Sequence, residues 1–287
     1  MSRVAYVNGR YVPHADARVH IEDRGYQFAD GIYEVWALLD GRLAEWDGHA
    51  ERLERSLSEL RIRRPMGREA LRAVLRETVR QNRVRDGLVY IQVTRGQAPR
   101  DHAFPLPEPE PSVVVTVKRI DLAAVEARAA KGVAVVTTPD DRWGRCDIKT
   151  VGLLSNVLAK QRAKAAGAFE AWFVDDLGLV TEGSSTNAWI VDAEGVLRTR
   201  GTNCNILRGV TRRSLIEVAR ANGIEVSERP FSVVDAKAAR EAFFTSASAF
   251  VMPVVSVDGA PIGDGAPGET TRKLRQLYLD RARREAI

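Results

Sequence analysis

The chain has 287 residues, of which 45% are hydrophobic and 28% charged, a composition typical of folded globular proteins. It excludes a disordered chain, a collagen-like fibre and a disulfide-rich miniprotein, and the length allows one large domain or two with a well-buried core. Two cysteines cannot build a disulfide framework, no apolar run is long enough to span a membrane, and no secretory signal opens the chain. We therefore expect a cytoplasmic protein.

The net charge of +5 comes almost entirely from arginine, because only seven of the 43 basic residues are lysines. The arginines alternate with acidic residues instead of forming the concentrated patch of a nucleic-acid-binding protein. We expect no nucleic-acid partner and no membrane partner. A non-enzymatic basic binding protein is the least favoured class of function.

Alternating apolar residues predict two β-hairpins near the N-terminus. The first turns at Asn8-Gly9, and the second pairs residues 32–39 with 43–46 through Asp40-Gly41. A helix capped by Asp47 should follow, with His49, Leu53, Leu57 and Leu60 on one stripe. Further elements are a helix over 68–83 and strands over 88–95 and 112–118.

Residues 97–111 have an unusual composition, since they carry five of the twelve prolines. Such a segment is neither helix nor central strand. Long ordered loops are more often functional than decorative, a simple tether being the alternative.

Strands and helices alternate beyond residues 119–123, which are the candidate domain boundary. Helices are expected over 124–131, 153–166, 211–222 and 269–284, and strands over 133–137, 171–174, 187–191, 243–245 and near Val226. This alternation predicts an α/β or α+β enzyme, with a small domain over 1–119, a linker over 120–123 and a larger domain over 124–287.

Three segments carry candidate chemistry. Lys149 differs from the other lysines because apolar Ile148 and Val151 flank it, and a lysine in apolar surroundings suits Schiff-base or proton-transfer chemistry. Residues 177–191 place Glu182 before a Gly-Ser-Ser-Thr-Asn run, either a plain turn or a cofactor-facing loop. Gly209 precedes a helix opening at Thr211, where backbone N–H groups suit a phosphate.

These motifs together resemble those of the fold-type IV pyridoxal-phosphate enzymes, and most of all the D-amino-acid transaminase family. The resemblance runs collinearly over about residues 3–260 and is carried by DRGYQFADGIYEV (23–35), HAERL (49–53), TRGQAPRDH (94–102), DIKT (147–150), VTEGSSTN (180–187) and ILRGVTR (206–212). It implies a two-domain α/β (α+β) fold with a barrel-like C-terminal domain, pyridoxal 5′-phosphate between the domains, and a homodimer.

Cofactor-binding residues follow from the resemblance by position. Lys149 matches the lysine that forms the Schiff base and moves the proton, and Glu182 matches the carboxylate that keeps the pyridine nitrogen protonated. Arg52 matches the arginine that contacts the cofactor phosphate, and Val210 and Thr211 match the helix start that cradles it.

One position departs from the family pattern. Ala247 stands where family members usually carry a threonine hydroxyl toward the phosphate, and Phe250 replaces a common acidic residue. Two alternatives remain open: Ser246 or Ser248 supplies the hydroxyl, or the phosphate is held more weakly.

Substrate binding is implied for Tyr33, Arg100 and His102, the last two matching the carboxylate-binding pair of D-specific members. The implied reaction is transamination of D-amino acids such as D-alanine and D-glutamate with 2-oxo acids such as 2-oxoglutarate or pyruvate. Branched-chain L-amino-acid transaminase and aminodeoxychorismate lyase, which share the fold, are the alternatives. No metal is expected.

Overall fold

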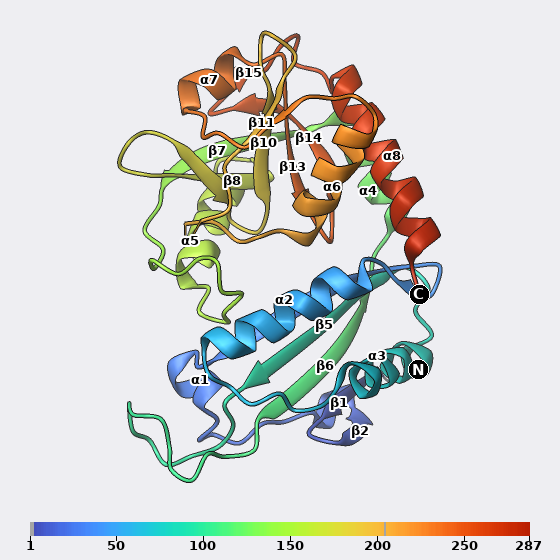
Figure 1. Cartoon of the computed structure of the whole chain (residues 1–287), viewed down its shortest axis with the longest axis vertical. Helices are drawn as coiled ribbons and strands as arrows, with labels where there is room; N and C mark the ends of the chain where they lie inside the picture. Colours follow the sequence, from blue (N-terminus) through green and yellow to red (C-terminus); the bar gives the residue numbers. More distant parts are fainter. Residues whose placement is uncertain (1–2, 204) are drawn as a thin grey trace. The chain divides into compact units, whose positions relative to one another are not determined.

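The computed structural model describes residues 3–203 and 205–287 and divides the chain into two compact units (Figure 1). The first unit comprises the chain up to Asp121 together with Ile148–Gly152 and Glu285–Ile287. The second comprises Leu122–Asp147 and Leu153–Arg284. The short segment Ile148–Gly152, which contains Lys149, therefore packs with residues far from it in the sequence.

The first unit is built on a six-stranded antiparallel sheet in the order β2-β1-β6-β5-β3-β4. Both predicted hairpins are confirmed, and the two central residues of each turn have positive φ, namely Asn8 (44°), Gly9 (90°), Asp40 (52°) and Gly41 (80°), as a type I′ turn requires. The strands are β1 (Val4–Val7), β2 (Arg10–Pro13), β3 (Gly31–Leu39), β4 (Arg42–Leu43), β5 (Gly87–Thr94) and β6 (Ser112–Arg119).

Helices α2 (Trp46–Glu59) and α3 (Arg68–Asn82) pack on this sheet, and α1 (Arg24–Phe28) precedes β3 (Figure 1). The predicted stripe of α2 is confirmed for His49, Leu53 and Leu57, which are buried. The predicted cap is wrong: the helix already begins at Trp46, and Glu45, in the left-handed conformation, precedes it. Trp46 is helical because its ring stacks on Trp36 of β3, with centroids 5.7 Å apart, so packing overrides its strand propensity.

The segment Ile148–Gly152 lies against the open edge of β3. The Tyr33 N–H donates to the carbonyl of Lys149 at 2.9 Å, and the Val151 N–H donates to the carbonyl of Gly31 at 3.1 Å. Ile148 is buried in the core of the first unit. These bonds fix the backbone of Lys149 beside Tyr33.

The second unit contains a mixed nine-stranded sheet in the order β12-β11-β10-β13-β14-β7-β8-β9, with β15 paired to β14. Its core is rich in aromatic rings, among them Trp189 stacked on Phe243. The strands are β7 (Val133–Pro139), β8 (Glu170–Val174), β9 (Val180–Gly183), β10 (Asn187–Val191), β11 (Leu197–Thr199), β12 (Val226–Ser227), β13 (Glu241–Ser246), β14 (Phe250–Val257) and β15 (Ala260–Pro261). The helices are α4 (Leu122–Lys131), α5 (Leu154–Ala165), α6 (Val210–Ala221), α7 (Val233–Ala238) and α8 (Glu269–Glu285).

Candidate active site

Lys149 and Tyr33 lie together in the first unit. The Lys149 ammonium is 4.1 Å from the centroid of the Tyr33 ring, a cation–π distance, and that ring stacks on Tyr90 at 5.6 Å. Burial is the main factor that raises the pKa of Tyr90, to about 12, so this phenol keeps its proton near neutral pH. The Lys149 N–H also donates to the Ser56 hydroxyl at 3.4 Å. The predicted lysine is thus held through its backbone, with an aromatic face under its ammonium.

Arg52 forms a bidentate ion pair with Glu34 of β3, at 2.9 Å from Nε to Oε2 and 2.7 Å from Nη2 to Oε1. His49 Nδ1 lies 3.0 Å from the same carboxylate. Burial alone would raise the pKa of Glu34, but the charges of Arg52 and His49 hold this pKa far below its usual value. Arg52 therefore stays charged and fixed in direction, as a phosphate-binding arginine must be.

Arg100 and His102 lie on the proline-rich loop, residues 97–111, which holds neither helix nor strand, as predicted. Both side chains are exposed and both contact the Phe28 ring of α1. The Arg100 guanidinium is 4.6 Å from the ring centroid, and the His102 ring is 5.4 Å from it, centroid to centroid. The predicted pair therefore shares one aromatic support.

Glu182 lies on β9 of the second unit and is 5% exposed. Its carboxylate accepts from Arg142 Nη1 at 2.5 Å, from Asn187 Nδ2 at 2.9 Å and from the Leu207 N–H at 3.1 Å. Such a network fixes the carboxylate and favours its ionised form. The prediction of a loop carboxylate is corrected, because Glu182 stands on a strand.

Arg142 is a residue that the sequence patterns did not single out. Burial would lower its pKa, but the hydrogen bond from Asp140 and the charges of Glu182 and Asp140 raise the pKa further above its usual value. Asp140 accepts from Nε and Nη2, both at 2.8 Å, and also from the Thr181 hydroxyl at 2.7 Å. The only signal in the sequence is a charged run, Asp140-Asp141-Arg142, seven residues before Lys149.

Val210 and Thr211 form the first turn of α6, and Gly209 is its N-cap. Within the described chain no side chain caps this helix, so its first N–H groups can receive an anion. Gly209 is required here, since a Cβ would lie 2.0 Å from Asn187 Oδ1. The Thr211 hydroxyl lies 3.4 Å from that of Tyr278.

Ser246 and Ser248 lie on the turn between β13 and β14 and flank Ala247. Their hydroxyl oxygens are 3.3 Å apart, and Ser246 Oγ also accepts from the Ala249 N–H at 3.1 Å. Ser246 is half-buried and Ser248 exposed. Either hydroxyl can still donate to an anion.

This donor chemistry fits pyridoxal 5′-phosphate. An uncapped helix N-terminus and a fixed arginine suit its phosphate, an oriented carboxylate suits its ring nitrogen, and a lysine suits its aldehyde. In residues 3–203 and 205–287 no group of three or more His, Cys, Asp or Glu side chains could hold a metal ion. The same residues contain no helix that meets the length and apolarity needed to cross a membrane.

Comparison with known proteins assigns the class of protein. The family model described as amino-transferase class IV matches residues 31–257. The chain is 40% identical over 269 residues to D-alanine aminotransferase from Bacillus licheniformis, covering 93% of each chain. It is 41% identical over 274 residues to D-alanine aminotransferase from Staphylococcus epidermidis, covering 95% of each chain.

Solved structures of branched-chain aminotransferases share the fold. The enzyme from Escherichia coli gives a TM-score of 0.90 at 24% identity, covering 98% of this chain and 95% of that one. The enzyme from Thermoproteus uzoniensis gives 0.83 at 27%, covering 97% and 94%. A third, from a T.th. strain and solved with pyridoxamine 5′-phosphate, gives 0.89 at 28%, covering 98% and 94%. The chain belongs to the class IV aminotransferases, enzymes that use pyridoxal phosphate to exchange amino groups between small amino and keto acids, so the family resemblance and the fold class are confirmed.

Proposed function

We propose that this aminotransferase takes the amino group from D-amino acids, D-alanine and D-glutamate among them, and passes it to 2-oxo acids such as 2-oxoglutarate or pyruvate. The observation that carries the proposal is the placement of Arg100 and His102 side by side on Phe28. Relatives that are D-alanine aminotransferases, 40–41% identical over 93–95% of the chain, support it.

The cofactor in this proposal is pyridoxal 5′-phosphate, which accepts the electrons left on the substrate Cα when its proton is removed. Lys149 binds the cofactor covalently and carries the proton to and from Cα. The hydrogen-bonded carboxylate of Glu182 holds a proton on the ring nitrogen, and Arg142 keeps that carboxylate ionised and oriented.

The phosphate group is assigned to residues that differ in chemistry. Arg52 supplies a fixed positive charge, because Glu34 and His49 hold it. Val210 and Thr211 supply backbone N–H groups at the start of α6. Ser246 and Ser248 supply hydroxyls in place of the one that Ala247 lacks.

Substrate orientation is assigned to Tyr33, Arg100 and His102. A guanidinium binds a carboxylate through two parallel hydrogen bonds, and this fixes direction as well as position. Once the carboxylate is fixed, only one enantiomer presents its Cα–H bond to Lys149. Carboxylate placement therefore selects the D-amino acid.

The alternative is a branched-chain L-amino-acid transaminase, favoured by the structural neighbours at 24–28% identity. It receives less support, since the D-alanine aminotransferases match the sequence at 40–41%. An aminodeoxychorismate lyase would use the same lysine and glutamate without an amino acceptor.

A donor panel tests the proposal. The holoenzyme is assayed with D- and L-amino acids as donors and with 2-oxoglutarate and pyruvate as acceptors. We expect high rates with D-alanine and D-glutamate and a poor rate with L-leucine. Preference for L-leucine or L-isoleucine over every D-amino acid would establish the branched-chain alternative.

Borohydride reduction tests the lysine separately. It should fix the cofactor to Lys149, identified by peptide mass spectrometry, and Lys149→Ala should bind cofactor without turnover. Recovery of the adduct on any of the other six lysines would contradict the assignment.

We further propose that the enzyme works as a homodimer, as the family resemblance implies. The exposed apolar residues of α5 (Leu154, Val157 and Leu158) support it, because a single chain leaves them open to water.

A further inference from the structure

Arg24 of α1 connects the helix to the proline-rich loop. Its side chain is 3% exposed. Nη1 donates to the carbonyl of Asp101 at 2.6 Å, and Nη2 donates to the carbonyl of His102 at 3.3 Å. These are the two carbonyls that directly follow Arg100, so Arg24 fixes the backbone that carries the proposed carboxylate-binding pair.

Arg24 is itself held by a buried ion pair. Its Nε donates to Asp30 Oδ2 at 2.8 Å, and Arg95 donates to both oxygens of the same carboxylate, at 2.8 and 3.0 Å. Arg95 is 2% exposed, and its guanidinium lies 3.7 Å from the ring centroid of Phe104, further along the loop. An Arg–Asp–Arg cluster therefore holds the loop at two places.

Helix α1 is joined to the start of the loop through its own backbone. The Arg24 N–H donates to the carbonyl of Gly96 at 2.9 Å. Phe28, one turn later, supports Arg100 and His102, and the Arg24 guanidinium lies 4.8 Å from the same ring. Arg24 thus contacts both the backbone of the loop and the ring on which its side chains rest.

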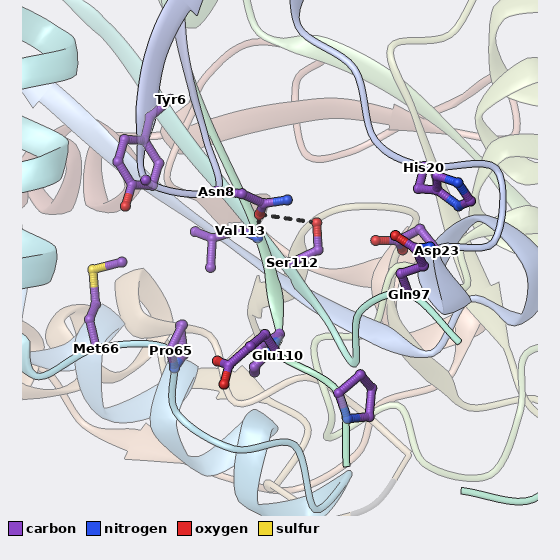
Figure 2. A pocket seen from close by; sticks show the side chains of 13 residues that line it. Tyr6, Asn8, His20, Asp23, Pro65, Met66, Gln97, Glu110, Ser112 and Val113 are labelled. Atoms are coloured by element: carbon purple, nitrogen blue, oxygen red, sulfur yellow. Dashed lines mark hydrogen bonds between the residues drawn. The ribbon is translucent and has the colours of Figure 1, made fainter. Parts of the chain in front are cut away.

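The two stems of the loop have no comparable support on their other side. Gln97 on one stem and Pro109–Ser112 on the other line a cavity of about 470 Å³, together with residues from β1 and from the segment before α1 (Figure 2). The ion pair between Arg63 and Glu110 at 2.7 Å is exposed to solvent, and such pairs contribute little. The position of the loop therefore depends mainly on the α1 side.

We propose that Arg24 is a positioning residue for the donor carboxylate: by holding the carbonyls of Asp101 and His102, it keeps Arg100 and His102 at the spacing that binds an α-carboxylate. This inference rests on the proposed function. Arg24 acts through the loop and is not a catalytic residue.

The test uses Arg24→Gln and Arg24→Lys in the holoenzyme. Gln removes the charge and the forked donors, whereas Lys keeps a charge that can reach one carbonyl. We expect Arg24→Gln to raise the KM for D-alanine about tenfold or more, since small misplacement of a positioned group is costly. Saturated kcat and the cofactor absorption spectrum should change little, and Arg24→Lys should recover part of the KM.

Two further measurements separate positioning from general damage. Trypsin should cleave the Arg100–Asp101 bond faster in Arg24→Gln, while cleavage near the C-terminus after Arg284 stays unchanged. Arg200→Gln is the matched control, because Arg200 is also buried and paired to a carboxylate, that of Asp175 at 2.8 Å, in the second unit. It should leave the KM unchanged.

The double variant Arg24→Gln/Arg100→Leu shows whether the effect passes through the loop. If Arg24 acts through Arg100, the second substitution adds little to the KM of Arg100→Leu. Additive effects, an unchanged KM, or unchanged cleavage at Arg100 in Arg24→Gln would each overturn the inference. A normal KM in Arg100→Leu with faster cleavage in Arg24→Gln would instead refute the carboxylate role of Arg100, and with it the functional part of the inference, while confirming the anchor.

Discussion

Glu34 illustrates at the scale of one residue what the sequence concealed. It occupies a position of β3 whose neighbours on the same face, Ile32 and Trp36, are core residues. A fully buried carboxylate is costly unless charged partners satisfy it, and here His49 and Arg52 do so from α2. The signal was a glutamate at a core position, which becomes informative only once the partner helix is known to face it.

We expect Glu34→Gln to destabilise the protein by about 3–5 kcal/mol at neutral pH, because it leaves the Arg52 charge buried without its counterion. The pKa of Glu34 is lowered in the folded state. Its contribution is therefore complete above the unfolded carboxyl pKa, about 4.3, and is lost as the pH falls below that value. The stability difference between wild type and variant should shrink below that pH.

Denaturant unfolding at neutral and acid pH measures this difference. Glu77→Gln is the control, because Glu77 also has a lowered pKa, about 2, from its bond with Arg80, but the pair is on the surface. Its effect should be far smaller. Equal effects of the two substitutions would contradict a structural role for the buried pair.

Glu182→Gln should keep the fold and the cofactor but lose about a hundredfold or more in turnover, the usual cost of removing one fixed electrostatic contact. A neutral amide cannot hold a proton on the ring nitrogen, although the Asn187 and Leu207 donors can still bond to its oxygen. Single-turnover kinetics with D-alanine, with cofactor content checked by absorbance, measures the loss. A change within about threefold, roughly 0.7 kcal/mol, would remove Glu182 from the proposed role.

At the scale of elements, the sequence predicted what local periodicity controls. Hairpin turns and the stripe of α2 depend on residues close in the chain, and both are confirmed. Strand β14 was missed because Pro253 interrupts its pattern, yet Pro253 pairs with Phe243 inside the sheet. Strand β9 was missed because four residues give no period, and its Glu182 is polar where a core strand is apolar.

The start of α6 gives a prediction about an element. In Gly209→Ala the new Cβ would lie 2.0 Å from Asn187 Oδ1, so the helix start must shift. We expect weaker binding of pyridoxal 5′-phosphate, measured by titrating the apoenzyme, since the N–H groups of Val210 and Thr211 would turn away from the phosphate.

Gly67→Ala is the matched control for this change. Gly67 is also the N-cap glycine of a helix, α3, and an added Cβ would have no atom within 4 Å. Its cofactor affinity should equal that of the wild type. Unchanged affinity in Gly209→Ala would show that α6 does not bind the phosphate.

At the scale of the whole molecule, the candidate site was predicted as a set of residues and not as a set of contacts. Motif spacing brought Lys149, Glu182, Arg52 and the Arg100–His102 pair to notice, whereas their supports stand far away in the sequence. Arg24 and Asp101 are 77 positions apart, and Arg142 and Glu182 are 40 apart. Contacts at such separations depend on how the sheets are ordered, and no local pattern encodes that order.

The proposed homodimer is tested by sedimentation of the whole protein. Leu154, Val157 and Leu158 are 73%, 59% and 58% exposed and lie three and four positions apart, so they form one apolar face of α5. Wild type should sediment at twice the chain mass of 31.7 kDa. Leu158→Glu should shift the protein toward the monomer, because a carboxylate buried in an apolar interface is strongly unfavourable. Gln161→Glu, an exposed position on the same helix, adds the same charge and should remain dimeric. A monomeric wild type would refute the dimer, and a fully dimeric Leu158→Glu would place the interface elsewhere.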